Sequence, residues 1–186
     1  QVNITIDAEY PVVTAEKGYG SIKLTLPPRT AMPADGGPVL KKLTGGFFGS
    51  QIPEDAQAVI GHAPAALEAA IRARAQQQKG MRYSYARDGG TLTVTALGVS
   101  AHSSKPEDGV NAISMLADAL AVQPWQGTQA ADMLSFLNEL VGTGIYGERF
   151  GQIAYRDGFM GPMTVAPTVL RQNGGALELN INLRRP

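Results

Sequence analysis

The sequence contains no cysteine, only two histidines and a single tryptophan. Without cysteine the chain can form neither a disulfide nor a thiolate metal site, although this absence fits a reducing or an oxidising compartment equally well. No apolar run approaches the length of a transmembrane helix, and the first residues have neither the basic start nor the apolar core of a signal peptide. We therefore expect a soluble protein that does not act at a membrane, and assign it to the cytoplasm.

An excess of charge of either sign is also missing. The 16 basic and 16 acidic residues balance, and like charges do not gather in runs. Nothing in this pattern predicts nucleic acid or an anionic membrane as a partner. With 186 residues, 44% of them hydrophobic, the chain can bury a core as one domain or as two small fused ones. It starts at Gln1 and ends on a strand-like run at Pro186, so we expect it to be a piece of a longer polypeptide.

Hydrophobic periodicity predicts an alternation of strands and helices. Ile22, Leu24 and Leu26 alternate with polar residues, which predicts a strand over 17–26, whereas the proline- and glycine-rich stretch 29–49 predicts a long loop. The further predicted strands are 56–60, 81–86, 91–97, 163–171 and 176–183, and the predicted helices are 65–78, 110–120 and 129–141. Leu140 is placed on the buried face of the last helix. This order predicts an α+β fold, a ferredoxin-like alpha-beta sandwich with a mainly antiparallel sheet and helices on one face.

His102 stands out because it lies where an apolar strand gives way to a helix. A lone histidine is more often structural than functional, but loops between a strand and a helix frequently carry functional groups. With a donated N–H, His102 could stabilise an oxyanion. A serine nucleophile activated by His102 is disfavoured, because the chain has no G-x-S-x-G elbow. The run Ser104-Lys-Pro-Glu107 predicts a capping box for the helix that follows.

The segment Gly98–Ile113 resembles the A-H-x-S-x-P-E-x-G-x-N-A-I signature in the lid domain of M20-family metallopeptidases, most closely in their dipeptidase branch. Other passages resemble the same lids in the same order, and they are 7–18, 45–56, 157–164 and 182–186. The resemblance therefore extends over nearly the whole chain.

This resemblance implies roles for four residues. His102 matches the lid histidine that stabilises the oxyanion, and Arg184 matches an arginine that clamps the substrate carboxylate, a task suited to its planar fork. Ser50 stands where the family has a substrate-positioning asparagine, although a serine hydroxyl lacks the paired donor and acceptor of an amide. Asp7 matches a carboxylate that ligates metal.

The implied function is the lid of a zinc-dependent dipeptidase. In that family a catalytic domain of the same polypeptide binds two zinc ions, and the lid closes over a dipeptide or another small peptide. Residues 1–16 would then link to, or be a remnant of, the metal-binding domain, and residues 17–186 would form the lid, with room for two pseudo-equivalent lobes. The chain has no H-x-D segment, no Glu-Glu pair and no third histidine, so we expect it to bind no zinc and to be inactive alone.

Two alternatives stay open. The parent enzyme could be an N-acyl-amino-acid amidase or a carboxypeptidase of the same family. The chain could instead be a non-enzymatic module that dimerises through exposed edge strands. At this length a monomer is preferred.

Overall fold

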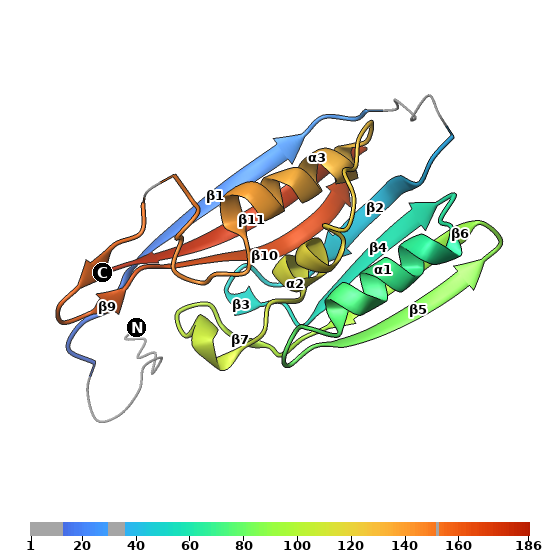
Figure 1. Ribbon diagram of the computed structural model, residues 1–186. Helices are drawn as coiled ribbons and strands as arrows, with labels where there is room; N and C mark the ends of the chain where they lie inside the picture. The colour runs from blue at the N-terminus through green and yellow to red at the C-terminus, as the bar shows by residue number, and fades with distance from the viewer. Residues whose placement is uncertain (1–12, 30–35, 152) are drawn as a thin grey trace, which may run out of the picture.

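The computed structural model describes residues 13–29, 36–151 and 153–186. In this part of the chain, a seven-stranded antiparallel sheet carries three α-helices on one face (Figure 1). The helices are α1 (Ala65–Ala75), α2 (Ala112–Ala119) and α3 (Gln129–Phe136). The predicted α+β fold, with a mainly antiparallel sheet and helices on one face, is confirmed. None of the described helices combines the length and the apolar character needed to cross a membrane.

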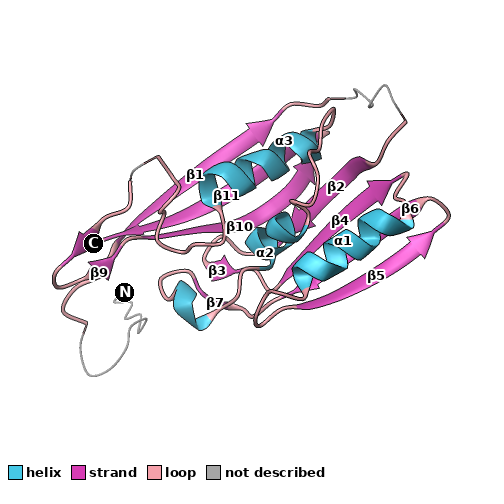
Figure 2. Ribbon diagram, viewed as in Figure 1, coloured by secondary structure: helices cyan, strands magenta, loops and turns pink. Residues whose placement is uncertain are grey.

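The strand order in the sheet is β1-β11-β10-β2-β4-β6-β5. The bounds of these strands are β1 (Gly18–Leu26), β2 (Val39–Gly45), β4 (Asp55–Gly61), β5 (Arg82–Asp88), β6 (Thr91–Leu97), β10 (Thr164–Asn173) and β11 (Ala176–Arg185). Two short ribbons lie outside the sheet (Figure 2) and pair β3 (Gln51–Ile52) with β7 (Ala101–His102) and β8 (Arg156–Asp157) with β9 (Gly161–Pro162). In chain order, β4, α1, β5, β6, α2 and β10 give the β-α-β-β-α-β succession of the ferredoxin-like motif, with α3 inserted after α2.

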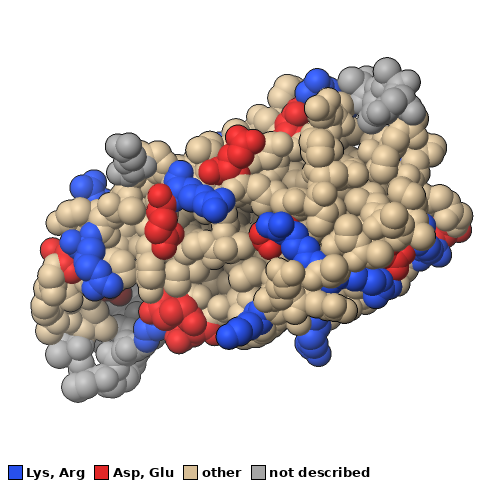
Figure 3. All heavy atoms as spheres, viewed as in Figure 1, with Lys and Arg blue, Asp and Glu red and all other residues tan. Residues whose placement is uncertain are grey.

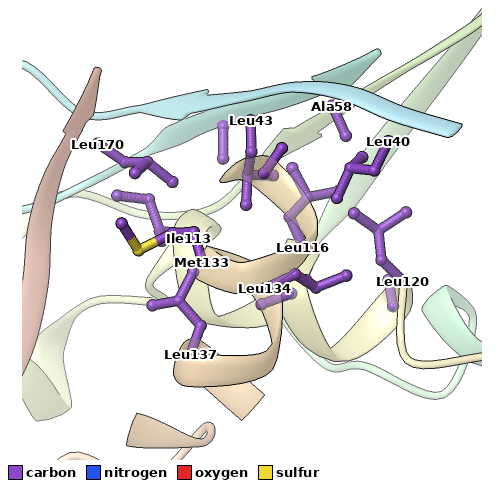
Figure 4. Packing of buried hydrophobic residues seen from close by; sticks show 14 of the residues in the cluster. Leu40, Leu43, Ala58, Ile113, Leu116, Leu120, Met133, Leu134, Leu137 and Leu170 are labelled. Atoms are coloured by element: carbon purple, nitrogen blue, oxygen red, sulfur yellow. The ribbon is translucent and has the colours of Figure 1, made fainter. Parts of the chain in front are cut away.

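The sheet consists of two blocks joined at a narrow seam. Strand β10 of one block pairs with strand β2 of the other at Leu170 and Gly45 alone. Helix α2 lies at this seam and contacts strands of both blocks. Apolar side chains from the sheet, from α2 and α3 and from the turn after α3 point toward one another there (Figure 4), and they include Leu40, Leu43, Leu116, Leu134, Leu137 and Leu170. One hydrophobic core therefore holds the two blocks together.

The predicted loop over 29–49 is wrong for its second half, because residues 39–45 form the central strand β2. Val39, Leu40 and Leu43 are buried, whereas Lys41 and Lys42 are exposed. A shift in the pairing register between Leu40 and Lys42 interrupts the strict alternation that marks a strand. The strand exists because β4 and β10 flank it, and neither partner is visible in the local pattern.

The predicted helix 129–141 changes character after Phe136. Residues Leu137–Val141 form a π-helical turn, in which the amide of Gly142 donates to the carbonyl of Leu137 at 2.7 Å. A π turn is wider than an α turn and shifts the buried position by one residue. Val141 is therefore buried and Leu140 is 42% exposed, so the prediction that Leu140 faces the core is wrong.

The predicted capping box at Ser104 is also wrong, because α2 is capped by Asn111. The Asn111 Oδ1 accepts hydrogen bonds from the amides of Ile113 and Ser114 at 3.1 and 3.2 Å. Its Nδ2 donates to the carbonyl of Pro167 at 2.8 Å, which ties the start of α2 to β10. A 3₁₀ turn at Pro106–Asp108 separates Ser104 from the helix. The Ser104 side chain is consequently free to contact another group.

Candidate functional site

His102 and Ser50 lie on adjacent strands of the β3–β7 ribbon. Gln51 of β3 pairs opposite His102 of β7. The amide of Ser103 donates to the carbonyl of Ser50 at 2.8 Å, which closes the ribbon at its outer end. Both His102 and Ser50 are exposed. The structure therefore brings two of the predicted site residues together at the surface.

The position of Arg184 follows from the register of β11. Arg184 lies opposite Thr164 of β10 and Tyr19 of β1, and cross-strand partners share one face of a sheet. Its guanidinium carbon lies 5.1 Å from the centre of the Tyr19 ring, within cation–π range. Among the carboxylates that the structure describes, none forms an ion pair with Arg184. A half-buried guanidinium with no internal counter-ion can receive an anion from outside.

Two hydrogen bonds join the His102 ribbon to the face that carries Arg184. The Thr164 hydroxyl donates to the carbonyl of Ser103 at 3.3 Å, and the Asn182 side-chain amide donates to the carbonyl of Gly49 at 2.8 Å. Asn182 and Arg184 are two residues apart on β11, so their side chains point to the same face. The loop ending at Ser50, the turn after His102 and the end of β11 therefore form one continuous surface.

Unpartnered polar atoms concentrate at this surface. Four buried side-chain polar atoms of the described residues have no hydrogen-bond partner, and three of them are Ser103 Oγ, Asn182 Oδ1 and Arg184 Nε. The fourth, Glu178 Oε2, lies 3.7 Å from Arg171 Nε and is thus paired electrostatically. Buried polar groups are almost always hydrogen-bonded, so exceptions grouped at one place indicate a site completed by another molecule or another part of the protein.

Ser103, Thr164 and Asn182 were not predicted as site residues. All three lie inside the passages that resemble the M20 lids. Ser103 follows His102 directly, Thr164 ends the passage 157–164, and Asn182 begins the passage 182–186 that contains Arg184. A search for polar residues within those passages would have found them. Their buried, bonded positions could not have been read from the sequence.

Asp157, also within a matched passage, has a structural role. Its carboxylate accepts hydrogen bonds from the amides of Met160 and Phe159, both at 2.8 Å, across the turn between β8 and β9. These two amides, that of Met160 first, hold the pKa of Asp157 below its ordinary value. The carboxylate therefore closes the turn between the two strands.

In the part of the chain that the structure describes, no three histidine or carboxylate side chains gather closely enough to hold a metal ion. Asp7, the implied metal ligand, lies outside the described residues. On the face seen in Figure 3, basic and acidic side chains are interspersed and form no patch of one sign. This agrees with the balanced composition.

Comparison with known proteins gives three findings. Residues 86–173 match the model of the M20 peptidase dimerisation domain. The chain is 29% identical over 187 residues to "Putative dipeptidase YtjP" of Bacillus subtilis (strain 168), covering 97% of this chain and 38% of that protein. It is 27% identical over 183 residues to "Beta-Ala-Xaa dipeptidase" of Lactobacillus delbrueckii subsp. lactis, covering 97% and 37%. The chain thus spans less than two fifths of the length of these curated relatives.

The matched segment runs from the end of β5 through β10 and includes His102, whereas Ser50 and Arg184 lie on either side of it. The two relatives each align with 97% of the chain, well beyond the matched segment. Fold, motif order and relatives agree with this match: residues 86–173 resemble the dimerisation domain of M20-family peptidases.

Proposed function

We propose that this chain is the lid of a zinc-dependent dipeptidase and that it closes over a substrate bound to a catalytic domain of the same polypeptide. The observation that carries the proposal is the surface shared by Ser50, His102 and Arg184, where three buried polar atoms lack partners. The dipeptidase names of both relatives support the choice of substrate class. A cytoplasmic location is part of the same proposal.

Each residue has a distinct task in this function. His102 donates an N–H to the oxygen that becomes negative when the peptide carbonyl is attacked, which is the charge that positioned donors stabilise best. Arg184 binds the free carboxylate of the dipeptide through both nitrogens of its fork. Ser50 contacts the peptide backbone between them. Because His102 and Arg184 are held on one surface, only a substrate of the right length can contact both side chains at once.

Zinc does not fit the described residues alone, because a protein zinc site requires three or more ligands. We therefore assign the metal to the catalytic domain of the same polypeptide, and the roles proposed for Ser50, His102 and Arg184 involve only residues of this chain. We place Asp7 among the metal ligands and residues 1–16 in the connection to that domain. Residues 17–186 form the lid.

The test uses the full-length polypeptide and the 186-residue chain side by side. The full-length protein should hydrolyse dipeptides, lose this activity to a chelator and regain it with zinc, while the chain alone should neither hydrolyse them nor retain stoichiometric zinc. Dipeptides amidated at the C-terminus should be poor substrates, because Arg184 then has no carboxylate to bind. Faster cleavage of N-acyl amino acids or of longer peptides would select the amidase or carboxypeptidase alternative.

A second candidate function is dimerisation, favoured by the family description of residues 86–173 and by the exposed edge strands β1 and β5. The two-block sheet supports a monomer instead, because two lobes on one chain share a core across the seam. Sedimentation equilibrium of the chain should return a single species of 19.6 kDa. A tight dimer of twice this mass would support the dimerisation module and contradict the monomeric lid.

A further inference from the structure

The ring of His102 is held from one side by the residue two positions later. Its Nδ1 lies 2.7 Å from the Ser104 hydroxyl oxygen and accepts a hydrogen bond from the Ser104 amide at 3.3 Å. A backbone amide can only donate, so Nδ1 must be an acceptor. In the neutral ring the proton therefore resides on Nε2.

The backbone makes this contact possible. The amide of Lys105 donates to the carbonyl of His102 at 2.9 Å and closes a turn over residues 102–105, which brings Ser104 back against the ring. The turn is fixed by Ser103, whose amide bonds Ser50 and whose carbonyl accepts from Thr164. Since Asn111 caps α2, no helix amide competes for the Ser104 hydroxyl.

We propose that Ser104 is a positioning residue that fixes the tautomer and orientation of His102, so that Nε2–H is presented as a donor while the ring is neutral. The inference rests on the proposed function, in which His102 donates to an oxyanion. With Nδ1 engaged by two groups of the same residue, the ring cannot turn Nδ1 outward without giving up both contacts. The donor is thereby aimed before the substrate arrives.

The first test is spectroscopic and uses the 186-residue chain. The chain has two histidines, and His62→Asn removes one set of imidazole nitrogen signals while asparagine tolerates the left-handed φ of 52° at that position. At alkaline pH, nitrogen-15 NMR should show His102 protonated on Nε2, with Nδ1 as a hydrogen-bonded acceptor. Ser104→Ala should move the Nδ1 signal toward that of a free acceptor, and Ser104→Thr should restore it. Ser100→Ala, a nearby exposed serine outside this contact, is the matched control.

A proton found on Nδ1, or nitrogen signals unchanged in Ser104→Ala, would overturn the inference whatever the enzyme does. The second test measures kinetics in the full-length protein. Ser104→Ala should lower kcat about tenfold with little change in KM, and Ser104→Thr should recover most of it, because a misaimed donor weakens only the transition state. An inactive wild type would refute the proposed function, whereas an active wild type with a fully active Ser104→Ala would refute the role of Ser104.

Discussion

Replacing His102 with alanine in the full-length polypeptide should lower kcat for dipeptide hydrolysis by about 100- to 1000-fold, the usual effect of removing one oxyanion donor. KM should change little, because the contact forms fully only when the carbonyl oxygen becomes negative. Steady-state kinetics on one dipeptide, with the metal content of each variant measured in parallel, would provide both constants. The loss should appear without loss of zinc, since His102 is not proposed as a ligand.

His62→Asn is the matched control for this experiment. His62 is also exposed, but it lies between β4 and α1, away from the surface formed by Ser50, His102 and Arg184. This variant should keep wild-type kcat. Full activity in His102→Ala would end the assignment of His102 as a donor, even if the polypeptide proved to be a dipeptidase.

Substituting Gly46 with alanine should destabilise the chain by roughly 2–5 kcal/mol, from a left-handed backbone and a steric clash combined. Gly46 has a φ of +66°, and a Cβ at this position would lie 2.0 Å from the carbonyl oxygen of Thr168 in β10. The next neighbour is the Cβ of the rigid Pro53 ring at 3.0 Å, so no flexible side chain can move aside. Chemical unfolding in urea, followed by circular dichroism, would measure the loss.

Gly89→Ala separates the cost of the left-handed backbone from the cost of the steric clash. Gly89 has a comparable φ of +53°, but a Cβ there meets nothing within 4 Å. The Gly89→Ala variant should lower the free energy of unfolding by only about 1–2 kcal/mol, the penalty of the left-handed conformation alone. Equal losses in the two variants would show that the contact between Gly46 and β10 is not tight.

The contact at Gly46 also connects stability with the site. Gly46 follows β2 directly, and its amide donates to the carbonyl of Asp55 at 3.2 Å. The loop from Gly46 to Ser50 starts at this point, close against β10. Forcing Gly46 away from Thr168 would therefore also displace Ser50 from the surface that it shares with His102.

The amino-acid sequence by itself determined the elements whose stability is local. The apolar alternation of β1, β4 and β6 and the apolar stripes of α1 and α2 are visible in short windows of the sequence, because the periodicity of each element is local. The motif around His102 and the closing Arg184 likewise pointed to the M20 lids. The sequence could name Ser50, His102 and Arg184 as separate candidates, although it could not show that they meet.

Only the tertiary structure decided the features that depend on a distant partner. Strand β2 is a strand because β4 and β10 pair with it, Leu140 is exposed because a π turn shifts the helix, and α2 is capped by Asn111, which is also bonded to β10. Hydrogen bonds from Thr164 and Asn182 bring the site together across the sheet. Sequence periodicity records which residues prefer burial, but the bonding of each polar atom depends on which strand comes to lie beside it.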